Sequence, residues 1–260
     1  MKILFLDMMK RNLIIFDLHR KRKSCTLCFG EQKGDLKFRL TLKSVKDVKA
    51  GSCAYMEEQS NMRKKSHIAL AGYLMREMDD VNMQKHWKAF YLGSILPDLT
   101  PKMITDPHEF DSSYLELKSR IGRLLLEARE HACKERTLFC RLGVVMHYLA
   151  DYFTFPHNTT FDGNLKDHCL YERDMKHELR ARIHTKEAVE IFESQQKKQN
   201  QIHTAAQLFD YIEEMHRTYL TRRRNLADDC RWIMEMCSWA LIGLVNIISG
   251  YENTATAVVI

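Results

Sequence analysis

Two pairs of side chains able to bind metal ions constrain this chain more than any other feature. The pairs are His147/Asp151 and His168/Glu172, and a Pro-His corner at Pro156-His157 lies between them. A separation of four residues places both members of a pair on one face of an α-helix, about one turn apart. The sequence therefore predicts two helices, joined through a turn, that present imidazole and carboxylate groups to a shared site.

Helical spacing of apolar residues continues through most of the chain after Met62, and strand-like alternation is scarce there. The helices expected from this spacing and from its breaks cover residues 67–78 (with Ser66 as N-cap), 87–95, 113–130, 135–153, 165–192, 204–226 and 230–248. On the helix at 113–130, Leu115, Ile121, Leu124 and Leu125 are expected to face a core. Residues 98–110 are expected to form a loop, since three of the four prolines lie in or just before it. These patterns predict an all-α fold with one multi-helix domain, residues 62–260, that contains a metal cleft.

Residues 1–61 differ from the rest, with 13 Lys/Arg against 7 Asp/Glu and weak periodicity apart from a candidate strand at 36–42. We treat them as a poorly patterned N-terminal extension. Two interpretations stay open. The segment is disordered or not natively translated, with translation starting at Met62, or it is a small accessory segment packed on the main domain.

Charge and cysteine content limit the partners and the compartment. Residues 62–260 carry 27 basic and 27 acidic residues, so they lack the basic field typical of nucleic-acid-binding proteins, and nucleic acid is not expected as a partner. Charged residues interrupt the apolar stretch 1–18, which argues against an export signal. The eight cysteines form no regular framework. We therefore expect reduced thiols in a cytoplasmic protein.

An apolar segment near the end of the chain, residues 232–248, has Glu235 as its only charge. It falls short of the ~20 apolar residues that cross a bilayer. A buried core helix is the favoured interpretation, and transient contact with a membrane surface is the alternative.

Further candidate ligands lie upstream of the two pairs: Asp98, His108 and, as an eighth member, His67, with Asp106 as the rival of Asp98. Imidazole and carboxylate ligands together favour Zn²⁺ over iron or manganese. The set contains no cysteine, which argues against a purely structural zinc site. Mixed sets of this kind are typical of catalytic sites, where zinc activates water, and two neighbouring metals can hold the oxygens of a phosphoester. Asp151, with two carboxylate oxygens, is suited to bridge such a pair.

The run from His147 through Asp151 to His157, followed by His168 and Glu172, resembles the zinc-dependent phospholipase C family. The pattern H-x3-D-x5-H and then H-x3-E is present without a gap. Ser66-His67, the Gly93–Asp98 segment and His108 look like the family's earlier metal-binding positions. The resemblance covers about residues 66–178.

This resemblance implies an all-α fold, zinc as cofactor and a phosphodiester hydrolase that uses metal-activated water. It assigns Asp98, His108, His147 and Asp151 to one zinc ion, His157, His168 and Glu172 to another, and His67 with bridging Asp151 to a third. It also implies that Asp98 acts as a general base. Secreted members complete the third site with an amino-terminal tryptophan, and this chain has no tryptophan before Trp87. Two or three ions are therefore expected.

The substrate implied is a phosphodiester or phospholipid-like molecule. Two alternatives stay open: a phosphodiesterase like the single-strand-specific zinc nucleases, which resemble the same family, and a non-catalytic, metal-stabilised binding module. The remaining histidines are expected to be ordinary surface or core residues, with His177 exposed on a helix. The triplet Arg222-Arg223-Arg224 is expected to form a solvated helix face.

Overall fold

The computed structural model describes residues 13–18, 23–32, 35–43, 50–99, 108–198, 202–223 and 225–257. The chain divides into two compact units, Met1–Asn61 and Met62–Ile260. The boundary falls within the first helix. Whether residues 1–61 are disordered, and whether translation starts at Met62, stay predictions.

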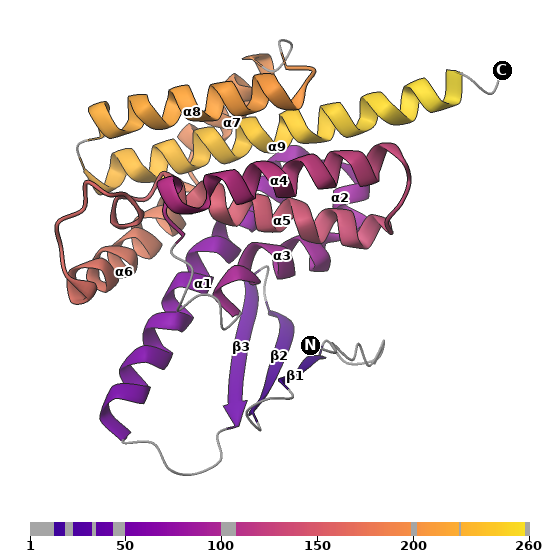
Figure 1. Cartoon of the computed structure of the whole chain (residues 1–260). Coiled ribbons are helices and arrows are strands. Elements are labelled where there is room, and N and C mark those ends of the chain that lie inside the picture. Colours follow the sequence, from indigo (N-terminus) through magenta and orange to yellow (C-terminus); the bar gives the residue numbers. More distant parts are fainter. Residues whose placement is uncertain are drawn as a thin grey trace. The chain divides into compact units, whose positions relative to one another are not determined.

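The first unit contains a three-stranded antiparallel sheet with strand order β1-β2-β3 (Figure 1). The strands are β1 (Leu13–Leu18), β2 (Lys23–Gln32) and β3 (Asp35–Lys43). Leu27 pairs with Ile14 on one side and with Leu40 on the other. The strand expected at 36–42 is thus part of β3, whereas the sequence analysis did not predict β1 and β2.

In the described part of the second unit the regular elements are helices, which confirms the all-α prediction. The elements are α1 (Ala50–Met78), which begins in the first unit, α2 (Val81–Lys85), α3 (Trp87–Ile95), η1 (Pro97–Leu99), α4 (Phe110–Arg129), α5 (Glu135–Tyr152), η3 (Phe155–His157), α6 (Leu165–Arg182), α7 (Lys186–Lys198), α8 (Ala205–Arg222) and α9 (Leu226–Ala257).

Side-chain caps start several of these helices. Asn164 accepts from the backbone N–H groups of Lys166 and Asp167, and the Asp167 carboxylate accepts from the Asn164 N–H, which together form a capping box for α6. Thr204 and Gln207 form the same arrangement at α8. These caps fix where α6, a helix that carries two candidate ligands, begins.

Three details differ from the sequence expectations. Ser66 is not an N-cap, because α1 is continuous through it. The helix expected at 165–192 is two helices, because α6 ends at Arg182 and Thr185 caps the start of α7 through the Ala188 N–H. Leu115 was expected in the core but is 79% exposed, whereas Ile121 and Leu124 are fully buried.

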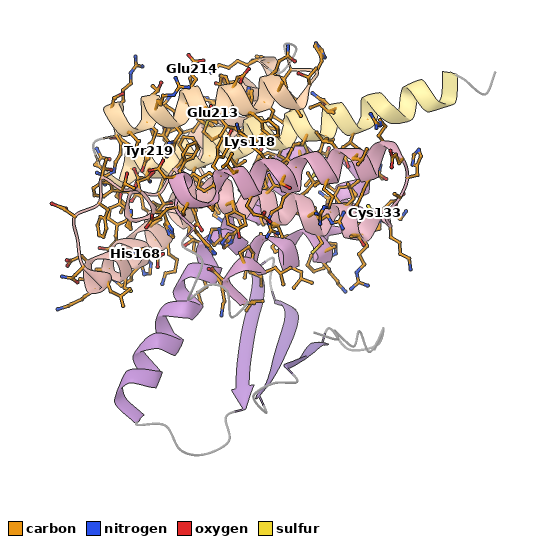
Figure 2. All side chains as sticks on the ribbon, viewed as in Figure 1. Lys118, Cys133, His168, Glu213, Glu214 and Tyr219 are labelled. Carbon is orange, nitrogen blue, oxygen red and sulfur yellow. The ribbon has the colours of Figure 1, made fainter. Side chains whose placement is uncertain are left out.

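The core of the second unit lies where α3, α4 and α9 pack around α5. Figure 1 shows α4, α5 and α9 running alongside one another. Gly143 of α5 lies against α3, and a Cβ there would be 2.2 Å from the Phe90 carbonyl oxygen. On the outer side, Lys118 of α4 forms an ion pair with Glu213 of α8 at 2.5 Å (Figure 2). The close α3–α5 contact matters for function because both helices lead into candidate ligands.

Within the described residues one segment, Leu226–Gly250 of α9, is long and apolar enough to cross a membrane, yet 67% of its most apolar window is buried inside the protein. Trp239, Leu241 and Leu244 are among its buried residues. The helix is longer than the expected 230–248 and packs as a core helix.

Candidate metal centre

The eight candidate ligands come from six parts of the chain and form three groups, of which the first two share His147. In each group the ligand atoms lie within 4.8 Å of one another. The groups are His67/His147/Asp151, Asp98/His108/His147 and His157/His168/Glu172. We call the first two together the His147 cluster and the third the His168 triad.

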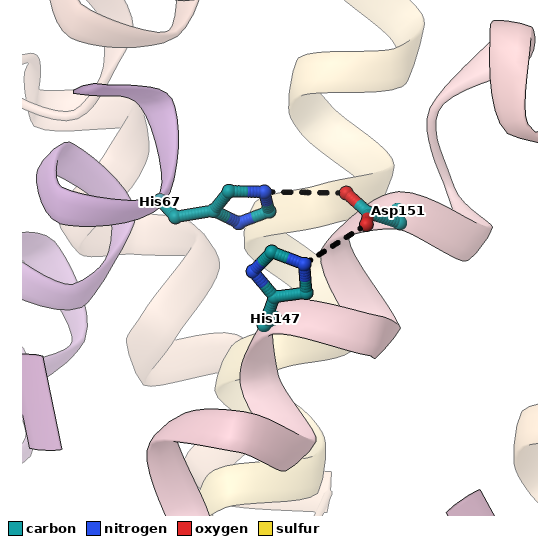
Figure 3. Close-up of side chains that lie close together, drawn as sticks. All are labelled: His67, His147 and Asp151. Carbon is teal, nitrogen blue, oxygen red and sulfur yellow. Dashed lines mark ion pairs between the residues drawn. The ribbon is translucent and has the colours of Figure 1, made fainter. Parts of the chain in front are cut away.

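Asp151 occupies the middle of the centre. Its Oδ1 lies 3.3 Å from His67 Nε2, and its Oδ2 lies 3.2 Å from His147 Nε2 (Figure 3). The two imidazole rings stack with centroids 3.9 Å apart. Oδ2 also lies 3.1 Å from His108 Nδ1, and Oδ1 lies 3.9 Å from His157 Nε2. One carboxylate therefore faces members of both the His147 cluster and the His168 triad, and its Oδ1 lies near a histidine of each.

Asp98 supplies a buried carboxylate oxygen that has no protein partner among the described residues. Its side chain is 3% exposed, Oδ1 lies 3.9 Å from His147 Nε2, and Oδ2 has no hydrogen-bond partner. Leaving such an oxygen unsatisfied costs about 1–3 kcal/mol, and more when it is charged. A divalent cation held by Asp98, His108 and His147 would satisfy this oxygen, so the donor set fits a metal ion.

The His168 triad joins η3 to α6. Glu172 Oε1 lies 2.9 Å from His168 Nε2, one helical turn earlier, and 3.3 Å from His157 Nε2. The His168 side chain is 18% exposed, whereas that of His147 is fully buried. The triad is thus the more accessible part of the centre.

Backbone packing orients His147. The ring Nδ1–H donates to the Ser94 carbonyl oxygen at 2.8 Å, which leaves the Nε2 lone pair directed toward the centre. Ser94 lies in the last turn of α3, next to Gly93. A Cβ at Gly93 would lie 1.9 Å from the Cys140 carbonyl oxygen of α5. Only glycine at this crossing lets α3 approach closely enough for the Ser94–His147 contact.

Buried hydrogen bonds fix the corner that carries His157. Asn158 Nδ2 donates to the carbonyl oxygens of Tyr152 and Thr154, at 3.2 and 2.9 Å. The Asn158 Oδ1 accepts from His216 Nε2 at 2.8 Å. Burial lowers the pKa of His216 to about 4, so this ring is neutral near neutral pH.

Comparison with known families decides the identity of this domain. The family described as zinc dependent phospholipase C matches residues 66–226, more than half of the chain and all eight residues of the centre. The chain belongs to this family. No curated protein and no solved structure matches the chain.

Ionisable groups are concentrated around Asp151 in this domain of the zinc-dependent phospholipase C family. Burial alone would raise the pKa of Asp151, but His157, His147 and His67, together with the His108 hydrogen bond, hold it well below its usual value. Burial would likewise lower the pKa of His147, but Asp151 and Asp98 raise it to about 9. The metal-free domain therefore holds a proton on His147 at neutral pH, and a metal ion must displace that proton.

A small cavity of about 30 Å³ opens between the His147 cluster and the His168 triad. This volume holds about two water molecules. Its polar wall includes His67, Asp151, His157 and Glu172, and its apolar wall includes Leu70, Met175, Leu179 and Ile233. Water or a phosphate oxygen can therefore approach both metal-binding groups from this space.

The structure brings together every candidate ligand named from the sequence. Asp106, the rival of Asp98, lies outside the described residues. His177 is exposed on α6, as expected. Sequence reasoning missed the Ser94 carbonyl, because a backbone acceptor leaves no side-chain signal. It also treated Arg223 as solvated, whereas its Nε–H donates to buried Asp229 at 3.0 Å.

Proposed function

We propose that this protein hydrolyses a lipid-like phosphodiester with zinc held at the His147 cluster and the His168 triad. The observation that carries the proposal is the convergence of eight imidazole and carboxylate side chains around Asp151, in the region matched by a zinc-dependent phospholipase C family. When bound, zinc would lower the pKa of a coordinated water molecule and neutralise negative charge on the phosphate.

The geometry favours two tight ions and a weaker third. The Nδ1–H of His147 donates to Ser94, so this ring offers a single nitrogen, Nε2, to the two groups that share it. If Nε2 binds a metal ion together with Asp98 and His108, the group around His67 keeps only His67 and Asp151 as ligands. The site around His67 is then short of ligands from the described residues, whereas the other two groups keep three each.

We assign distinct tasks to the two central carboxylates. Asp151 faces imidazoles on both oxygens and would hold neighbouring ions at a fixed separation. Asp98 has a second oxygen, Oδ1, beside the Oδ2 that a metal ion would satisfy, so one oxygen of this carboxylate can take a proton from the attacking water. The protein is proposed to act in the cytoplasm, where thiols such as those of buried Cys230 and Cys237 stay reduced.

Turnover by the zinc-loaded full chain tests the proposal. Phosphatidylcholine vesicles and bis-p-nitrophenyl phosphate should both be hydrolysed between pH 6 and 9, and a chelator should stop the reaction. Asp98→Asn should lower turnover roughly 10²–10⁴-fold with most zinc retained. The control His177→Ala, at an exposed position of α6 outside the three groups, should leave turnover unchanged.

Three outcomes would contradict the proposal in different ways. Full zinc occupancy without turnover would indicate a metal-stabilised binding module. Faster degradation of single-stranded DNA than of phospholipid would indicate a nuclease. Loss of zinc in Asp98→Asn would make Asp98 a ligand only.

A further inference from the structure

A fully buried carboxylate, Asp229 of α9, lies outside the residues that the family matches and outside the three candidate groups. It accepts four hydrogen bonds from three other parts of the chain. The donors are the Phe155 backbone N–H (3.0 Å), the Tyr171 hydroxyl (2.6 Å), the Tyr219 hydroxyl (3.1 Å) and Arg223 Nε–H (3.0 Å). A buried charge with this many donors is held in one position.

The two oxygens of Asp229 serve different elements. Oδ2 accepts from Phe155 of η3 and from Tyr171 of α6. Oδ1 accepts from Tyr219 of α8 and from Arg223 just after it. The elements joined by Oδ2 are the same two that supply the His168 triad. Phe155 precedes His157 by two residues, and Tyr171 immediately precedes Glu172.

Arg223 contacts both elements that Asp229 Oδ2 joins, η3 and α6. Its Nη2 donates to the Tyr171 hydroxyl at 2.8 Å, so the hydroxyl hydrogen of Tyr171 is directed to Asp229. The guanidinium also lies 3.7 Å from the centre of the Phe155 ring. The network therefore ties η3 to α6 through side chain, backbone and ring contacts at once.

We infer that Asp229 is the positioning residue of the His168 triad: through Oδ2 it sets the separation between His157 on η3 and Glu172 on α6. The inference rests on the metal-binding part of the proposed function. Asp229 acts on the triad through its hydrogen bonds with Phe155 and Tyr171. Partners that orient metal ligands in this way typically contribute about 10–100-fold to metal affinity.

Two tyrosines provide a matched test. Tyr171→Phe and Tyr219→Phe each remove one buried hydroxyl donor to the same carboxylate, but only Tyr171 lies on a helix that carries triad ligands (Figure 2 labels Tyr219 on α8 and His168 on α6). Zinc affinity is measured on the full chain by competition with a chromophoric chelator. The triad's zinc is identified as the equivalent that His168→Ala removes.

Tyr171→Phe should weaken the triad's zinc about 10-fold, whereas Tyr219→Phe should leave it within about 2-fold, even if both variants lose similar stability in urea. Asp229→Asn should weaken the same zinc by at least as much as Tyr171→Phe. Equal zinc affinity in the two tyrosine variants would overturn the inference, because the network would then be a general structural support. If the wild type binds zinc but hydrolyses no substrate, only the proposed function fails. The inference about Asp229 is still tested, because zinc affinity is measured without turnover.

Discussion

The two parts of the candidate metal centre are held by different forces. In the His147 cluster, the central histidine is fully buried and is oriented by two helices in close backbone contact. In the His168 triad, His168 is partly exposed. The corner that carries His157 is held by hydrogen bonds that Asn158 donates to the backbone and by the Phe155 N–H, which donates to Asp229. Helix packing thus holds the His147 cluster and hydrogen-bond networks hold the His168 triad. Substitutions in the two parts should therefore have different effects on stability and on zinc binding.

The largest effect should come from the carboxylate that both parts share. In the metal-free protein, Asp151→Asn removes the charge that faces His67, His108 and His147, and breaking a buried pair of this kind costs about 3–5 kcal/mol. Glu172→Gln in the more exposed triad should cost about 1–2 kcal/mol. Urea unfolding in the presence of a chelator measures both. Equal losses would contradict the difference in burial between the two parts.

The α3–α5 crossing should be nearly as sensitive. Gly143→Ala places a Cβ 2.2 Å from the Phe90 carbonyl oxygen and 2.7 Å from the Ser94 backbone nitrogen, so the helices must separate at a cost of about 3 kcal/mol. Gly122→Ala on α4 is the matched control, because its Cβ meets nothing within 4 Å. The free energy of unfolding of Gly122→Ala should rise by about 0.5–1 kcal/mol, because alanine has a higher helix propensity than glycine. A thermal melt in which both variants shift alike would show that the crossing tolerates a methyl group.

The raised pKa of His147 should make the stability of the metal-free protein depend on pH. Its folded pKa of about 9 lies above its ordinary value of 6.5, so the stability that its proton contributes is present below pH 6.5 and is lost as the pH rises through 9. Urea midpoints measured across this range should therefore fall with pH. His147→Gln should flatten that fall, whereas an unchanged pH profile in this variant would assign the dependence to another group.

The smallest effect on stability is expected in the triad. His168→Ala should remove one equivalent of bound zinc while it lowers the metal-free stability by about 1 kcal/mol, the usual contribution of one hydrogen bond, here with Glu172. His177→Ala, on the same helix but exposed and outside the three groups, should change neither quantity. Zinc titration and urea unfolding of the two variants check this. A full complement of zinc in His168→Ala would remove His168 from the metal centre.

The sequence predicted the elements whose signals are local. The helix at 87–95 was exact, because an apolar run ends there before Pro97. Five candidate ligands, His147, Asp151, His157, His168 and Glu172, were found because four-residue spacing and the Pro-His corner are visible in the sequence. The other three, His67, Asp98 and His108, were supported by the resemblance to the family. The break between α6 and α7 was missed because no glycine or proline marks it. Asp229 and the Gly143 contact were missed because they depend on tertiary packing between elements far apart in the chain.

Anomalous diffraction at the zinc edge, from crystals of the zinc-loaded protein, tests the central claim most directly. We expect one peak within about 2.0–2.2 Å of ligand atoms from Asp98, His108 and His147, and a second within the same distance of His157, His168 and Glu172. Peaks bound to other side chains, or no peak at either group in zinc-loaded crystals, would contradict a shared metal centre around Asp151.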